Sequence, residues 1–306
     1  MRGFESSQAH IKLLTGRSAQ SALFCIRLYR VRVVRQAAAG FTYIDLLLLL
    51  VVLVWGAHFG VVKAALAYIH PVAFVSLRFS AATAVLFLLL WISEGSVGLR
   101  TRRDFYWCLL LGVFSGVDQA LWMTGLRLTS SAKAALLLST SPLFVTLLAF
   151  LRGERLTARS VLGMLLAFLG VSLVVWPYGE GFTLRALTGG QLAGDLLILL
   201  AAVFWGAYVV YGAQVLDRHS ALRVTSWTFL WTAVVVTLPA AGLVARTPLT
   251  TLPLPAWWSF GYSVLLAGVL AFVLWYYGVQ HIGSLRVAIY QYLVPVVAML
   301  LAYWLW

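Results

Sequence analysis

Nine apolar stretches, each long enough to cross a lipid bilayer as a helix, constrain the fold of this chain more than any single motif. A helix rises about 1.5 Å per residue, so crossing a hydrocarbon core of about 30 Å takes roughly 20 apolar residues. With 62% hydrophobic and 10% charged residues, the composition excludes a water-soluble globule. The stretches cover residues 45–63, 72–92, 105–126, 131–151, 159–176, 195–215, 222–243, 257–279 and 285–306. We therefore predict an all-α polytopic membrane protein.

A duplication relates the two halves of the chain. The run from Asp45 to Trp55-Gly56 returns from Asp195 to Trp205-Gly206. A second block returns with a three-residue shift, in which Trp122, Gly125, Ser131, Lys133 and Pro142 match Trp275, Gly278, Ser284, Arg286 and Pro295. The first unit contains five spans, an odd number, so the second unit should enter the membrane from the opposite face. The chain should thus be an inverted repeat of five-helix units.

The first repeat should occupy residues 45–177 and the second residues 195–306. By this alignment nine transmembrane helices are present, and a tenth is missing at the C-terminus. A truncated sequence and a protein that lacks this helix both fit the pattern, and we favour truncation.

Residues 1–44 differ in kind, because they carry seven Lys or Arg against the single acid Glu5. We expect a disordered cytoplasmic tail; an organelle transit peptide and a start codon assigned too far upstream are alternatives. Cationic loops stay cytoplasmic during insertion, so the distribution of Lys and Arg predicts a cytoplasmic N-terminus. The expected location is the cell inner (plasma) membrane. The net charge of +13 then requires no nucleic-acid partner. The expected partners are membrane lipid and a small-molecule substrate.

Several short elements, taken in order, resemble the EamA-type branch of the drug/metabolite transporter superfamily. These elements are Trp55-Gly56, Leu77-Arg78, Gln119 through Leu126, Thr129 through Ala132, Pro142, and Gly153-Glu154-Arg155-Leu156 before Gly163 and Gly170. The resemblance implies a ten-helix fold with a central cavity and export of small metabolites such as amino acids, or uptake in some relatives. The chain departs from the pattern where Thr228 stands in the second half at the position of Arg78.

The third apolar stretch contains the strongest candidate for the lining of a cavity. Asp118 lies in mid-helix, where an ionised group facing lipid costs about 2.5–3.5 kcal/mol, so it must face protein or water. Ser115, Asp118, Trp122 and Gly125 share one helical face, with Gln119 at its edge. Asp118 is predicted to bind a substrate ammonium or to exchange a proton; a structural hydrogen bond to a neighbouring helix is the alternative.

Further binding candidates are aromatic or titratable. His58 follows Trp55 by three positions, and the matching pair in the second repeat is Trp205 and Tyr208. An imidazole titrates near neutral pH, so His58 is a candidate for substrate binding or proton coupling, with helix packing as the alternative. The remaining predicted substrate-binding residues are Trp122, Trp275, Tyr290 and Gln291. For the tryptophans, packing and interface anchoring are alternatives.

A second set of residues is predicted to act in gating. Lys133 and Arg286 occupy equivalent repeat positions, which inversion would place on opposite membrane faces; Arg78 is a further candidate, for a gate or for a substrate carboxylate. Snorkelling of the side chain to the interface is the alternative for all three cations. Pro142 and Pro295 should kink the fourth and ninth helices and provide bending points.

No nucleotide-binding, metalloprotease or dinucleotide fingerprint occurs in the sequence, so we predict no enzyme, no cofactor and no metal site. The predicted function is secondary transport: export of amino acids or similar zwitterionic or amphiphilic compounds by alternating access between the repeats. A nucleotide-sugar or organic-phosphate carrier of the same superfamily is the first alternative. A membrane-embedded enzyme or a receptor is a weaker one. The motifs Gly56-xxx-Gly60 and Gly112-xxx-Gly116 favour close helix contact within the bundle, in a monomer or a homodimer.

Overall fold

A computed structural model describes residues 41–151, 162–163, 166, 169–170 and 190–305, and every element that it assigns is helical. The first unit contributes α2 (Tyr43–Ala65), α3 (Pro71–Glu94), α4 (Arg102–Leu128), α5 (Ser131–Leu138) and α6 (Ser141–Leu151). The second contributes α9 (Gly190–Leu216), α10 (Ala221–Ala245), η1 (Leu249–Thr251), α11 (Leu254–Val264), η2 (Leu265–Leu270), α12 (Ala271–Ile282), α13 (Ser284–Tyr290), η3 (Gln291–Leu293) and α14 (Val294–Leu305).

Eight helical segments of the described residues are long and apolar enough to cross a membrane, which confirms eight of the nine predicted spans. They are Tyr43–Ala65, Pro71–Glu94, Arg102–Leu128, Lys133–Leu151, Gln191–Leu216, Ala221–Ala245, Leu254–Ile282 and Ser284–Leu301. The predicted tail at 1–44 and the predicted span at 159–176 lie almost entirely outside the described residues. The all-helical, multi-pass fold follows directly from the apolar stretches.

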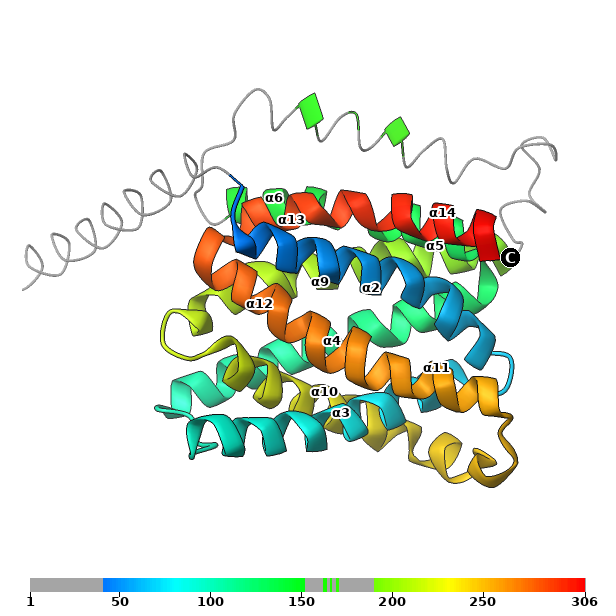
Figure 1. Cartoon of the computed structure of the whole chain (residues 1–306), viewed down its shortest axis with the longest axis horizontal. Helices are drawn as coiled ribbons and strands as arrows, with labels where there is room; N and C mark the ends of the chain where they lie inside the picture. Colours follow the sequence, from blue (N-terminus) through cyan, green and yellow to red (C-terminus); the bar gives the residue numbers. More distant parts are fainter. Residues whose placement is uncertain (1–40, 152–161, 164–165, 167–168, 171–189, 306) are drawn as a thin grey trace, which may run out of the picture. The chain divides into compact units, whose positions relative to one another are not determined.

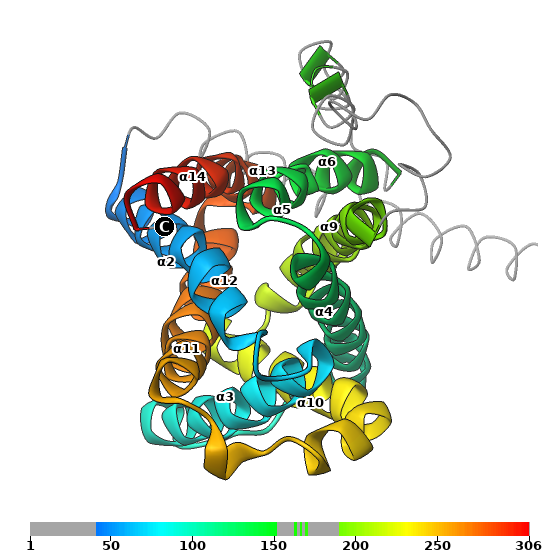
Figure 2. The same ribbon diagram turned by 90° about the vertical axis from the view of Figure 1, so that its right-hand side faces the viewer.

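The helices pair in a pattern that repeats with the roles of the two units exchanged. The two second helices, α3 and α10, pack against each other. The third segment of each unit packs against the first helix of the other, α4 against α9 and α11 with α12 against α2. The end of each fourth segment does the same, α6 against α9 and α14 against α2. α2 and α9, the first helices of the two units, run in opposite directions (Figure 1). Seen from one end of the bundle, α3 and α10 form one layer, and the short helices α5, α6, α13 and α14 lie across the opposite side (Figure 2).

The ends of α3 and α4 follow local capping rules. The His70 side chain accepts a hydrogen bond from the Val72 amide, and Pro71 occupies the first helical position, where no backbone donor is needed. Gly95 directly follows α3 and caps its end, with a left-handed φ of 65° that suits glycine. Thr101 caps α4 by accepting a hydrogen bond from the Asp104 amide. These caps hold the hairpin that places Arg78 and Asp118 on adjacent antiparallel helices.

The fourth segment of each unit is interrupted next to its matched proline. α5 ends at Leu138 and α6 begins at Ser141, so that Pro142 is the second residue of the new helix. In the second unit the short 3₁₀ turn η3 joins α13 to α14, of which Pro295 is likewise the second residue. The structure therefore differs in detail from the predicted kinks: each proline starts a helix, where its missing amide proton costs nothing, rather than bending a continuous one.

Glycines in the GxxxG motifs allow close helix contacts within the bundle, as predicted. A Cβ at Gly112 would lie 2.3 Å from Cβ of Trp231, and one at Gly56 would lie 2.5 Å from Val297. These residues bring α4 onto α10 and α2 onto α14. By contrast, a Cβ at Gly242 would meet no atom within 4 Å.

We expect Gly112→Ala to destabilise the folded protein by about 1–3 kcal/mol, the usual cost of forcing extra atoms into a packed core. α4 and α10 must separate, because the added methyl would also lie 3.0 Å from the Thr232 backbone nitrogen, which cannot rotate away. Thermal unfolding in detergent measures the effect, with Gly242→Ala as the matched control. Equal melting temperatures for the two variants would contradict the contact.

Candidate functional site

A pocket lies among helices of both units. α2, α3, α4, α9 and α12 contribute to its lining, together with residues at the interruptions of the two fourth segments. The lining residues are Trp55, His58, Phe59, Arg78, Asp118, Gln119, Trp122, Leu138, Trp205, Phe272, Gln291 and Val294. Six of them, His58, Arg78, Asp118, Gln119, Trp122 and Gln291, are site residues predicted from the sequence.

Opposite charges from α3 and α4 are connected in this pocket through an amide. Arg78 is 2% exposed and Asp118 is 1% exposed, so both charges are removed from bulk water and from lipid. Nη1 of Arg78 donates to Oε1 of Gln119 at 2.9 Å, and Nε2 of Gln119 donates to Oδ2 of Asp118 at 2.7 Å. Arg78 is therefore held inside the bundle, which argues against the snorkelling alternative.

A π-helical turn in the seventh span supplies further polar partners. Nε of Arg78 donates to the carbonyl oxygen of Ser263 at 3.0 Å, just before η2, and Nε2 of His58 shares a hydrogen bond of 2.8 Å with the Ser263 hydroxyl. Within η2, the Ala267 carbonyl accepts from Nε1 of Trp55 at 3.1 Å. A π turn disturbs the regular ladder of backbone hydrogen bonds, and such turns often lie at functional sites.

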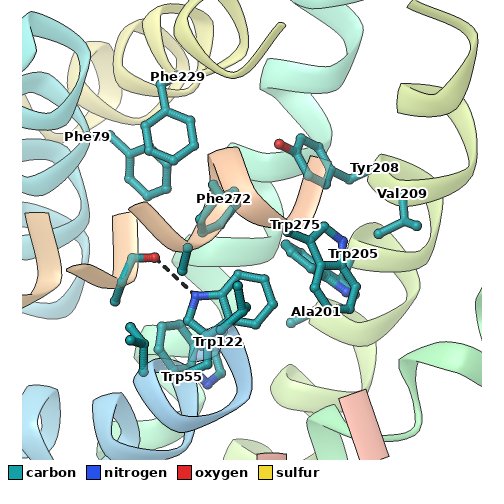
Figure 3. Close-up of a cluster of buried hydrophobic side chains, with 14 of the residues drawn as sticks. Trp55, Phe79, Trp122, Ala201, Trp205, Tyr208, Val209, Phe229, Phe272 and Trp275 are labelled. Atoms are coloured by element: carbon teal, nitrogen blue, oxygen red, sulfur yellow. Dashed lines mark hydrogen bonds between the residues drawn. The ribbon is translucent and has the colours of Figure 1, made fainter. Parts of the chain in front are cut away.

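Aromatic rings form an apolar wall of the same pocket. Figure 3 shows the cluster of rings to which they belong. The ring of Trp55 packs edge-on against Trp205 and Phe272, with centroids 5.4 and 5.5 Å apart. Trp55 and Trp205 occupy matched positions in the two repeats, so the duplication itself brings the pair together. Such edge-to-face packing is typical of rigid aromatic clusters.

The other predicted aromatic residues lie behind or beyond this wall. Tyr208 stacks on Trp205 at 5.4 Å and Trp275 lies 5.0 Å from Trp55, but neither lines the pocket. Tyr290 lies at one end of the bundle, where its hydroxyl donates to Asp45. Gly125 faces α9 rather than the pocket, because a Cβ there would lie 2.7 Å from the Gly194 carbonyl oxygen.

Two pocket residues carry buried polar atoms that have no hydrogen-bond partner in the described part of the chain. They are Nε1 of Trp122 and Oε1 of Gln291, on residues that are each 4% exposed. An unsatisfied buried donor or acceptor costs about 1–3 kcal/mol. Their presence at the pocket is consistent with a ligand, or a second conformation, that supplies the missing partners.

The two matched cations, Lys133 and Arg286, form equivalent ion pairs between the units. Nζ of Lys133 lies 2.6 Å from Oδ2 of Asp195 at the start of α9, and Nη2 of Arg286 lies 3.1 Å from Oδ1 of Asp45 at the start of α2. Both carboxylates are 1% exposed or less. Because α2 and α9 run in opposite directions, the two pairs lie at opposite ends of the bundle (Figure 1).

A third ionic cluster lies at the start of α4. Asp104, at the start of α4, pairs with Arg218 at 2.7 Å and with His219 at 3.1 Å in the connection between α9 and α10. Nearby, Arg223 pairs with Glu94 at 2.7 Å. No local spacing in the sequence reveals this role of His219, because its partner Asp104 lies 115 positions away.

Sequence reasoning also missed the partners of its own candidates. Asp45 and Asp195 were noticed only as marks of the repeat, although their matched positions could have paired them with the matched cations. Ser263 carries no signal, since its role depends on a π turn that no motif announces. Within the described residues no group of three or more His, Cys, Asp or Glu could hold a metal ion.

Comparison with known proteins agrees with this architecture. The profile of the EamA-like transporter family matches twice, over residues 42–176 and 192–306, which indicates two duplicated units. The chain is 28% identical to the uncharacterized transporter YyaM of Bacillus subtilis (81% of each chain) and 29% identical to an uncharacterized transporter of Archaeoglobus fulgidus (85% of this chain, 88% of the relative). It is 30% identical to a protein of Streptantibioticus cattleyicolor named "Probable terminal-alkyne amino-acid exporter" (84% of each chain).

A solved crystal structure superposes with a TM-score of 0.64 at 23% sequence identity, over 86% of this chain and 88% of the other, which shows a shared fold. The two family matches together cover most of the chain, and the relatives named as transporters align with more than four-fifths of it. The protein is therefore a multi-pass membrane transporter and not an enzyme. The chain belongs to the EamA-like transporter family.

Proposed function

We propose that this chain exports amino acids or similar zwitterionic or amphiphilic metabolites across the cell inner membrane, with its N-terminus in the cytoplasm. The observation that carries the proposal is the presence of buried Arg78 and Asp118 in one pocket beside an aromatic wall. A guanidinium recognises a carboxylate, a carboxylate recognises an ammonium, and aromatic rings accept an apolar side chain. The relative named as an amino-acid exporter supports the same substrate class.

Alternating access between two inverted repeats is the proposed mechanism. The opposite directions of α2 and α9 support inversion, as do the helix contacts that recur with the units exchanged. The ion pairs Lys133–Asp195 and Arg286–Asp45 would close opposite ends of the bundle in turn. The interrupted segments at Pro142 and Pro295 supply flexible points beside the pocket.

The pocket is less suited to nucleotide sugars or organic phosphates. Arg78 is the single Lys or Arg among the described residues that line it, and Asp118 offsets its charge. A phosphorylated substrate carries more negative charge than one guanidinium neutralises, so a phosphate carrier would need additional cations.

Counterflow in proteoliposomes tests the proposal. Purified protein is reconstituted with a high internal concentration of unlabelled amino acids, and a pooled panel of labelled amino acids is added outside. We expect saturable, transient accumulation of at least one amino acid over protein-free vesicles. Folded protein that accumulates none of them would overturn the amino-acid assignment, and a panel of sugar phosphates and nucleotide sugars would then be tested in the same vesicles.

A further inference from the structure

Arg78 and Asp118 lie in one pocket without forming a direct ion pair. No contact within 4.0 Å joins their charged atoms; Gln119 lies between them instead. Buried opposite charges usually gain from pairing directly, because each one replaces the water that the other has lost. The separation of the Arg78 and Asp118 charges therefore requires a group that binds both of them from a position in between.

Gln119 is chemically suited to this task, because a carboxamide is both donor and acceptor. Its oxygen faces the guanidinium of Arg78 and its nitrogen faces the carboxylate of Asp118, so each end meets the charge that it complements. A carboxylate at this position would repel Asp118, and an ammonium would repel Arg78. An apolar side chain would satisfy neither charge.

This arrangement leaves capacity on both charged groups. The hydrogen bonds of Arg78 within the described chain use Nε and Nη1, and those of Asp118 use Oδ2. Nη2 of Arg78 and Oδ1 of Asp118 make no hydrogen bond to the described residues. Both atoms keep some accessible surface, because neither belongs to the buried polar atoms that lack a partner. Both residues line the pocket, so these two atoms are available to a ligand.

We propose that Gln119 determines substrate specificity: by holding Arg78 and Asp118 apart, it makes the pocket select molecules that carry both a carboxylate and an amine. The carboxylate of the substrate binds Nη2 of Arg78, and its ammonium binds Oδ1 of Asp118. A molecule with one of these groups leaves the other buried charge uncompensated, which penalises its binding. This inference rests on the proposed function, because it concerns the same pocket.

Competition against labelled leucine in the counterflow assay tests the role of Gln119. The competitors are unlabelled leucine, isoamylamine, which lacks the carboxylate, and isocaproate, which lacks the amine. In the wild-type protein, leucine should compete much better than either fragment. In Gln119→Glu the new carboxylate pairs with Arg78, so the pocket loses its site for the substrate carboxylate and gains negative charge. Selectivity for isoamylamine over leucine should rise about tenfold, which corresponds to about 1.4 kcal/mol.

Two further variants separate specificity from folding. Gln119→Met keeps the length of the side chain but removes both hydrogen bonds, so Arg78 and Asp118 should pair directly and leucine transport should be lost with no gain of amine recognition. Gln191→Glu makes the same chemical change at an exposed position in the first turn of α9 and should leave selectivity unchanged. Monodisperse elution in detergent verifies that each variant folds.

The outcomes distinguish the inference from the proposed function. If wild-type protein accumulates leucine but selectivity in Gln119→Glu equals that of Gln191→Glu, amino-acid transport stands and the role of Gln119 is refuted. The same holds if isoamylamine competes as well as leucine in the wild-type protein. If folded wild-type protein accumulates no amino acid, both fail together.

Discussion

We expect Arg78→Leu to lower the counterflow rate by roughly 100-fold or more. The substitution removes the only Lys or Arg among the described pocket residues and leaves Asp118 buried without a compensating charge. Leaving a buried charge uncompensated typically costs about 3–5 kcal/mol, and each 1.4 kcal/mol changes an equilibrium constant tenfold. Initial uptake of the best-accumulated labelled amino acid, normalised to folded protein, measures the effect.

Two companion variants make the result at Arg78 interpretable. Arg78→Lys keeps the positive charge but loses the planar fork that reaches Ser263 and Gln119 together, so it should fold like the wild type and transport more slowly. Arg127→Leu changes an exposed arginine near the end of α4 and should transport at the wild-type rate. Wild-type transport by Arg78→Leu would show that the guanidinium is structural and that the substrate binds elsewhere.

The fold was largely predictable because membrane insertion imposes strong constraints on sequence. An apolar stretch of about 20 residues has few alternatives to a spanning helix, since lipid offers no partner for the backbone polar groups. Eight of the nine predicted spans are accordingly helical in the described residues. The duplication was visible for a related reason: the aspartates and tryptophans that begin each repeat keep the same spacing.

The candidate site was only partly predictable, and the reason is geometric. Burial cost singled out Asp118, because a charge in mid-helix must face protein or water. Gln119 followed from its place at the edge of the same helical face. The orientation of an aromatic ring carries no comparable penalty, so Tyr208 and Trp275 were as plausible as Trp122, and they lie behind the pocket rather than on it. Contacts that join distant segments, such as His58 with Ser263, depend on how helices dock and leave no mark in local spacing.

We expect Asp195→Asn and Asp45→Asn to change apparent substrate affinity in opposite directions on the two sides of the membrane. Each substitution preserves the shape of a side chain while removing the charge that binds Lys133 or Arg286. A hydrogen bond to a charged group contributes about 1.5–3 kcal/mol, so losing it should shift the balance between two conformations by roughly tenfold or more. Under the proposed alternating access, each variant favours the state that is open at its own end.

The affinity for substrate should therefore rise when it is measured from the end that opens and fall from the other end, because apparent affinity scales with the population of the competent state. Inside-out and right-side-out vesicles, each assayed with the best-accumulated amino acid, provide the two measurements. Asp217→Asn, in an exposed position after α9, is the matched control and should change neither. Since Lys133–Asp195 and Arg286–Asp45 lie at opposite ends of the bundle, the two variants must have mirror-image effects if the pairs are gates. Equal losses from both sides would instead mean that the ion pairs only stabilise the fold.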